Sequence, residues 1–342
     1  MDRSLSLDLI KGIAVLVMIF ANTSIYFFNF IDFNFIRLIC SFAAPVFLIL
    51  TGYFTQMNLL KRDVNKSILI SRALQILSIA VFIDMFFWGT IPFVTYDILY
   101  LIAFSQLILI FIDFKYYIFL FLLILFGSFI LPYLISYRFE IDEIPIQLFD
   151  IFTTIANANP IKRLFYDGWF PILPWLAFVL LGAFTFSHKL FFTKYSPHFL
   201  FLGLSLFALT YFVIVDQVYP IRNFYLELWY PLKNILLLIP FSVFFIIAGL
   251  IDNRFKRPIP VLNILIILGK NSLFAYIFNS FLMSLVIFLG LNQSNYPWYF
   301  IPFFISIVVL GVLIMDRFRK SEKWAFTPSF IKFFLGYNQK LQ

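Results

Sequence analysis

The chain has 342 residues, of which 63% are hydrophobic and only 12% are charged, and its mean hydropathy is +0.97. A soluble domain carries about a quarter charged residues, so the composition excludes a soluble globular protein, and the high hydrophobicity excludes a disordered chain. One cysteine and two histidines rule out an internal disulfide and leave no basis for predicting a metal site.

Ten apolar runs follow one another along the chain, each suited to crossing the roughly 30 Å hydrocarbon core of a bilayer. They lack the alternation of β-barrel strands, so we expect helices. The short joins at 113–115 and 291–296 predict antiparallel neighbours. The expected fold is an all-α membrane protein, a polytopic bundle of about ten transmembrane helices in a single domain over residues 1–320. The runs are residues 9–28, 35–57, 67–88, 94–112, 116–136, 170–187, 198–216, 233–250, 272–290 and 297–315.

Basic residues predict the orientation of these helices, because Lys and Arg concentrate in cytoplasmic segments. With the N-terminus inside, most of the 25 Lys and Arg residues fall on the cytoplasmic side. Both termini are then cytoplasmic, and the net charge of +8 reflects membrane topology rather than binding to nucleic acid. The outer side holds only Arg37, Arg138, Lys162, Arg163, Arg222 and Lys233.

Two segments are not expected to cross the membrane. The stretch 137–169 is the longest loop on the outer side, and residues 146–156 within it are suited to a surface helix. The tail, residues 321–342, places Trp324 and several phenylalanines among lysines, which is typical of an interfacial amphipathic segment. We expect the tail to anchor the chain at the cytoplasmic membrane surface.

The first span carries its polar side chains on one face. Asp8 and Lys11 are three residues apart, so they share a helix face and can form an ion pair, with Arg3 before them. Asn22 follows about three turns later on that face. The stripe predicts a path from a charged cytoplasmic end toward the outer third of the membrane. Alternatively, the basic residues obey the positive-inside rule and Asn22 forms an interhelical hydrogen bond.

Two carboxylates mark the outer ends of the third and fourth spans. Asp84 lies about one turn inside the third span, and Asp97 begins the fourth. A charged side chain near the bilayer centre costs about 2.5–3.5 kcal/mol on insertion scales and normally faces a cavity or a partner. The simpler interpretation places both at the wet interface. Asp84 is the stronger functional candidate of the two.

The ninth span begins with Gly269-Lys270-Asn271-Ser272. Asn271 or Ser272 can cap a helix that starts there, and Gly269 permits the turn before it. Such an N-terminus also favours phosphate, which Lys270 would strengthen, although capping alone explains these residues equally well. Asn279 lies two turns further along, roughly 10 Å into the bilayer.

The entrance to the sixth span combines paired prolines with tryptophan. Pro171 and Pro174 are three residues apart, and Trp169 and Trp175 flank them. Interfacial aromatic anchoring explains the tryptophans but not the prolines.

Motifs for nucleotide binding, for zinc proteases and for serine hydrolases are absent from the sequence.

These polar residues resemble those of a known family. The pattern Arg3-x4-Asp8-x2-Lys11-Gly12, followed by Asn22, resembles the first helix of heparan-α-glucosaminide N-acetyltransferase and its bacterial relatives. Those proteins belong to the superfamily of polytopic membrane acyltransferases. Three further segments agree in the order of the family: residues 44–52, 170–182 and 269–276.

The resemblance implies an enzyme of a bacterial plasma or inner membrane. It implies transfer of an acyl group, usually acetyl, from cytoplasmic acyl-CoA to a sugar or glycan at the other face, with membrane lipids as further partners and no metal. The implied acyl-CoA site is formed by Arg3, Lys11, Lys270, Asn271 and Ser272. The catalytic candidates are Asp8, which orients Lys11, together with Asn22, Asp84 and Asn279.

The chain departs from the family pattern in two ways. Lys11 stands where the family usually has Arg, which keeps the charge but loses a bidentate fork. The family relies on a histidine in or just after the first span, where this chain has none, and Asn279 stands at another family histidine. An amide cannot act as a general base. Either a carboxylate such as Asp32, Asp84 or Asp97 takes that role, or the transfer chemistry has been lost.

Two other functions stay open at this point. The chain could be a catalytically inactive relative that binds or translocates a lipid-linked sugar, or an unrelated secondary transporter. Transporters often carry inverted repeats with paired broken helices. The sequence shows no internal repeat, which counts modestly against a transporter.

Overall fold

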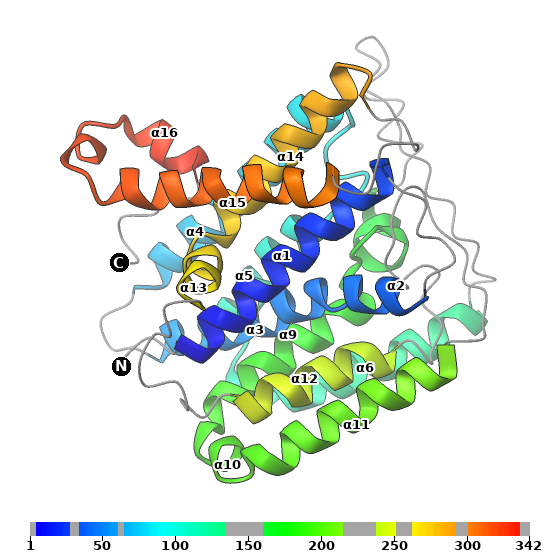
Figure 1. Ribbon diagram of the computed structural model, residues 1–342. Coiled ribbons are helices and arrows are strands. Elements are labelled where there is room, and N and C mark those ends of the chain that lie inside the picture. The colour runs from blue at the N-terminus through cyan, green and yellow to red at the C-terminus, as the bar shows by residue number, and fades with distance from the viewer. Residues whose placement is uncertain are drawn as a thin grey trace. The chain divides into compact units, whose positions relative to one another are not determined.

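The computed structural model describes residues 5–27, 34–60, 65–134, 160–214, 237–250, 262–291 and 300–335. Every regular element within these ranges is a helix, as the composition predicts (Figure 1). The chain divides into two compact units. Unit 1 comprises residues 1–47 and 188–335, and unit 2 is formed mainly by residues 48–187, so that helix α3 (Ala43–Leu59) contributes to both.

Unit 1 is built on α1 (Leu5–Phe27), an apolar helix of 23 residues. It packs mainly against α13 (Asn263–Lys270) and also contacts α14 (Ser272–Phe288) and α15 (Phe300–Arg319). A second pair, α11 and α12, lies side by side (Figure 1). The remaining bounds in this unit are α2 (Asn34–Cys40), α10 (Lys189–Lys194), α11 (Ser196–Ile214), α12 (Leu238–Leu250), η6 (Glu322–Trp324) and α16 (Ser329–Phe334).

Unit 2 contains two helix pairs, α4 with α5 and α6 with α9. Two π-helical turns occur here, η1 (Asp84–Trp88) directly after α4 and η3 (Arg163–Asp167) shortly before α9. Such turns are rare and often occur at functional sites, so they give the first indication of a site in this unit. The other bounds are α4 (Lys66–Ile83), α5 (Ile98–Phe111), η2 (Phe114–Tyr116), α6 (Tyr117–Leu134), α8 (Pro160–Lys162) and α9 (Ile172–Ser187).

Two glycines allow α3 and α9 to approach each other closely in unit 2. A Cβ atom on Gly52 would lie 1.8 Å from the carbonyl oxygen of Val179, and one on Gly182 would lie 1.9 Å from that of Ile49. Both distances are far below van der Waals contact, so only glycine fits at these positions. Both glycines belong to the segments that carry the family resemblance.

Five described stretches are long and apolar enough to cross a membrane, or seven if each of two bent helix pairs is one span. Helices α9 and α12 are apolar but shorter. The predicted count of ten is therefore not confirmed, and the cytoplasmic location of both termini stays a prediction. The five stretches are Leu5–Ser24, Phe35–Leu59, Lys66–Trp88, Ser196–Val213 and Phe300–Arg319.

The predicted join at 113–115 is a break between helices, but its geometry differs from the prediction. The chain bends by 114° between α5 and α6, so the two are not antiparallel neighbours, and α6 packs against α9 instead. The join at 292–296 lies outside the described residues. The proposed surface helix at 146–156, and the rest of the loop up to residue 159, lie outside them as well.

Candidate functional site

In unit 1, α1 and α13 run antiparallel and touch backbone to backbone. A Cβ atom on Gly12 would lie 1.9 Å from the carbonyl oxygen of Leu265, and one on Gly269 would lie 2.0 Å from that of Asp8. Gly269 lies inside α13 and is needed for this close packing. The prediction that it permits a turn before the next helix was wrong, because α13 continues through it.

We call this backbone contact between α1 and α13 the seam. It brings the charged end of α1 to the end of α13. Asp8 is almost completely buried, with 1% of its surface exposed, and Lys11 is half-buried. Lys270, the last residue of α13, is exposed. Asn22 is half-buried further along α1, and Arg3 lies outside the described residues. The predicted residues of the first and ninth spans therefore meet at their charged ends, while their roles stay predictions.

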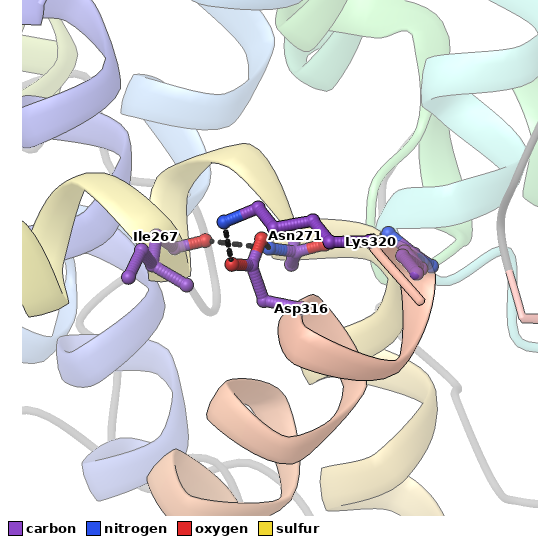
Figure 2. Close-up of polar contacts among 5 residues, drawn as sticks. Ile267, Asn271, Asp316 and Lys320 are labelled. Atoms are coloured by element: carbon purple, nitrogen blue, oxygen red, sulfur yellow. Dashed lines mark hydrogen bonds and ion pairs between the residues drawn. The ribbon is translucent and has the colours of Figure 1, made fainter. Parts of the chain in front are cut away.

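Asn271 lies at the break between α13 and α14, where the axes bend by 83°. Its Nδ2 donates to the carbonyl oxygen of Ile267 at 3.0 Å and to Asp316 Oδ1 at 3.1 Å (Figure 2). Its Oδ1 accepts a hydrogen bond from Arg319 Nη1 at 2.5 Å. The side chain makes no capping bond to α14. The capping prediction was wrong, because the amide is bound by α13 and α15.

Charged residues at the end of α15 complete this polar cluster. Lys320 forms an ion pair with Asp316 at 2.5 Å, as Figure 2 shows. The guanidinium of Arg319 lies 5.9 Å from the centre of the Phe274 ring, within cation–π range. The sequence analysis assigned the basic residues to topology and missed Asp316. The available signal was the spacing of four residues between Asp316 and Lys320, which places them on one helix face.

Buried polar atoms without a hydrogen-bond partner among the described residues include two that bear on the predicted site. They are Ser6 Oγ and Asn279 Oδ1, and their residues are 2% and 1% exposed. An unsatisfied buried group costs about 1–3 kcal/mol, so each such group in a folded protein calls for an explanation. A bound ligand would supply one for Asn279, which keeps its place as a predicted functional residue. Ser272, at the start of α14, is half-buried.

In unit 2, the predicted candidate Asp84 is held by hydroxyl groups. The residue is 3% exposed and begins η1. Its Oδ2 accepts hydrogen bonds from the Tyr100 hydroxyl at 2.6 Å and from Thr95 Oγ1 at 3.3 Å. A buried carboxylate needs such donors, because burying an unpaired charge is costly. The sequence analysis did not single out Tyr100 or Thr95.

The loop that carries Thr95 is strained. Phe93 and Tyr96 have φ values of 63° and 50°, a region that residues with a Cβ atom rarely adopt. Strain of this kind costs of order 1–3 kcal/mol and clusters at functional sites. Tyr96 is buried, and burial raises its pKa to about 12, so the phenol stays protonated at neutral pH.

Segment 163–170 holds this loop in place. Arg163 Nη1 donates to the carbonyl oxygen of Val94 at 3.2 Å, and Trp169 N donates to that of Thr95 at 2.8 Å. Trp169 is 1% exposed, so interfacial anchoring does not describe it. Arg163 is buried too, whereas the sequence analysis counted it only as an outer basic residue. The aromatic entrance predicted around residues 167–175 is thus part of the support for Asp84.

The other carboxylate of this region has a structural role. Asp97 caps α5, since its Oδ1 accepts a hydrogen bond from the backbone N–H of Ile98 at 2.6 Å. Asp32, the third carboxylate considered as a base, lies outside the described residues. Within the described part of the chain, no group of three or more His, Cys, Asp and Glu residues is placed to hold a metal ion.

Comparison with known proteins decides the family. The family model described as "Acyltransferase domain" matches residues 4–316. The chain belongs to this acyltransferase family. No curated protein and no solved structure matches it.

The match confirms the broader part of the resemblance, to the superfamily of membrane acyltransferases. It does not extend to the narrower heparan-α-glucosaminide N-acetyltransferase group. The described residues Asp8, Lys11, Asn22, Asp84, Lys270, Asn271, Ser272 and Asn279 lie inside the matched region, which begins after Arg3 and ends at Asp316. In this acyltransferase, Arg319, Lys320 and the tail therefore lie beyond the family domain.

Proposed function

We propose that this acyltransferase moves an acyl group, most simply acetyl, from cytoplasmic acyl-CoA to a sugar hydroxyl or amine at the outer face of a bacterial inner membrane. The observation that carries the proposal is the seam in unit 1 that joins Asp8 and Lys11 to the end of α13, in a chain of the acyltransferase family. The carbohydrate acceptor follows from the resemblance of the sequence motifs, Arg3-x4-Asp8-x2-Lys11-Gly12 above all, to the heparan-α-glucosaminide N-acetyltransferase group.

The basic residues along the seam suit the donor. Acyl-CoA carries several phosphates, and Lys11 and Lys270 supply positive charge beside them, with Arg3 as a further contact. Asp8 orients the Lys11 ammonium, which lies one turn along the same helix face. The amide of Asn271 is held by α13 and α15 and is therefore presented in a single orientation.

The chemistry is a simple displacement at the thioester. The acceptor oxygen or nitrogen forms a bond to the carbonyl carbon, the C–S bond breaks, and CoA leaves as the thiolate. The acceptor proton passes to a base and then to the thiolate, so the products are the acylated sugar and CoA. The Asn22 amide donates a hydrogen bond to the acyl carbonyl, where negative charge develops. Asn279 Oδ1 accepts a hydrogen bond from the acceptor hydroxyl or amine. We keep Asp84, the buried carboxylate of unit 2, as the candidate for that base.

The test uses membranes that contain the full chain and acetyl-CoA labelled in the acetyl group. Wild-type membranes should transfer label to carbohydrate. Lys11→Ala should raise the KM for acetyl-CoA at least about tenfold, because one charge-assisted contact is worth about 1.5–3 kcal/mol. Lys11→Arg restores the usual family residue and should retain activity. Lys189→Ala removes an equal charge from an exposed position of α10 and serves as the control.

The outcomes separate the proposal from its alternatives. Transfer that disappears in Asp84→Asn, while acetyl-CoA still binds, supports the assignment of the base. Binding of acetyl-CoA by the wild type without any transfer identifies an inactive relative. Absence of both binding and transfer removes the proposal and leaves a transport function.

A further inference from the structure

One guanidinium joins the C-terminal segment to the bend between α13 and α14. Arg319 Nη1 donates to Asn271 Oδ1 at 2.5 Å, and Arg319 Nη2 donates to the backbone carbonyl oxygen of Leu335 at 2.5 Å. Charge-assisted hydrogen bonds of this kind are about twice as strong as neutral ones. Asn271 belongs to the family domain, whereas Leu335 lies 19 residues beyond its end at residue 316. The same side chain thus binds both.

The segment that ends at Leu335 is folded onto itself rather than extended. Lys332 Nζ donates to the carbonyl oxygen of Ala325 at 3.2 Å and lies 5.5 Å from the Trp324 ring centre. The guanidinium of Arg319 lies 5.8 Å from the centre of the same ring. Trp324 and Lys332 are both buried. The tail from residue 321 to residue 335 therefore forms a compact cap around the Arg319 side chain.

The bonds to Asn271 fix which way its amide points. Nδ2 has two acceptors, Ile267 O and Asp316 Oδ1, and Oδ1 receives the guanidinium of Arg319. Asp316 is itself paired with Lys320. A reversed amide would set NH2 against the guanidinium and the carbonyl against Asp316, placing like groups together. Removing Arg319 takes away half of this discrimination.

We infer that Arg319 is a positioning residue, through which the tail 321–335 holds the Asn271 amide in the orientation that the donor site requires. The inference rests on the proposed function for its effect on acyl-CoA, but the physical link between tail and bend stands apart from it. An arginine is needed because its planar fork serves two acceptors at once, whereas a lysine has a single ammonium nitrogen.

The link is tested by hydrogen exchange on the full chain in lipid nanodiscs. We expect Arg319→Gln to raise amide exchange at least fivefold both in residues 263–274 and in residues 325–335. Arg319→Lys should raise it in at least one of the two segments, because a single ammonium nitrogen replaces the planar fork. Arg317→Gln, an exposed arginine on the same helix, should leave both unchanged. Faster exchange in the tail alone, or in neither segment, overturns the inference.

The effect on the site is tested by kinetics with acetyl-CoA. Arg319→Gln should raise the KM for acetyl-CoA at least fivefold with little change in kcat, whereas a purely structural role would reduce the amount of active protein and lower the apparent kcat alone. A loss confined to kcat therefore contradicts the positioning role. If the wild type transfers no acetyl group, the proposed function has failed, and the exchange experiment still decides whether the tail holds the bend.

Discussion

The side chain of Asp84 shows how an apolar bundle keeps a carboxylate. Its Oδ2 accepts hydrogen bonds from the hydroxyl groups of Tyr100 and Thr95, at 2.6 and 3.3 Å. The Tyr100 oxygen in turn accepts a weak hydrogen bond from the backbone N–H of Phe93 at 3.4 Å. A chain of hydrogen bonds thus runs from the strained residue Phe93 through the Tyr100 phenol to the Asp84 carboxylate. The loop conformation and the buried carboxylate therefore stabilise each other.

Removal of the phenol hydroxyl should therefore cost stability. In Tyr100→Phe, the Asp84 carboxylate loses its shortest hydrogen bond, and we expect a loss of about 1–3 kcal/mol in the free energy of unfolding. Tyr116→Phe removes the same atom from an exposed side chain and should change the stability by less than about 0.5 kcal/mol. Thermal unfolding in detergent measures both. Equal effects of the two substitutions would contradict the role given to Tyr100.

Substitution of Asn279 should have the opposite effect on stability, because its Oδ1 is buried without a partner among the described residues. Asn279→Leu replaces an unsatisfied amide with an apolar group of similar size, so the unfolding midpoint should rise. The same substitution should lower acyl transfer at least tenfold, since functional sites often retain groups that cost stability. Asn263→Leu, at an exposed position, is the control. A lower midpoint for Asn279→Leu would show that the amide is structural.

At this scale the sequence identifies charges in apolar runs but not the side chains that satisfy them. Asp84 could be predicted because a carboxylate inside a span is expensive. Tyr100 and Arg163 could not, because a tyrosine and an arginine near the end of a span are also what interfacial anchoring and the positive-inside rule produce. Their burial depends on the fold of loop 89–97, which no local pattern encodes.

At the scale of elements, the ninth span is broken where the sequence predicts a simple beginning. The chain forms α13 before the break, and the α13–α14 pair bends by 83° at Asn271. The predicted helix start at Ser272 is confirmed. The preceding helix was missed because the apolar run 264–268 is too short to be a span, and its helical form depends on packing against α1.

Because α1 and α13 pack backbone to backbone, one methyl group added at Gly269 should destabilise the protein. In Gly269→Ala, the new Cβ atom would lie 2.0 Å from the carbonyl oxygen of Asp8, so the two backbones must move apart. Such overpacking costs about 1–3 kcal/mol. Gly127→Ala, in α6, meets no atom within 4 Å and should stabilise the helix by up to about 1 kcal/mol. Unfolding midpoints that shift in the same direction would contradict the close approach.

At the scale of the whole molecule, the number of crossings depends on the two bent helix pairs and on the two short helices α9 and α12. Composition and hydropathy predict an all-helical membrane protein, and every described element is a helix. Hydropathy alone counts any apolar run as a span, however. The 16 residues of α9 extend about 24 Å and the 13 described residues of α12 about 20 Å, both less than the roughly 30 Å of hydrocarbon. A window of apolar residues contains no information on where the helix inside it begins.

Single-cysteine labelling of intact cells decides whether α9 crosses. The natural chain is a suitable background, because Cys40 is its only cysteine and is fully buried. Ile161 and Leu190 flank α9 and are 71% and 88% exposed. The distribution of Lys and Arg predicts that Ile161→Cys reacts with a membrane-impermeant maleimide in intact cells and that Leu190→Cys reacts only after permeabilisation. Reaction of both in intact cells would mean that α9 turns back without crossing, because a chain that crosses once must carry its two ends to opposite sides.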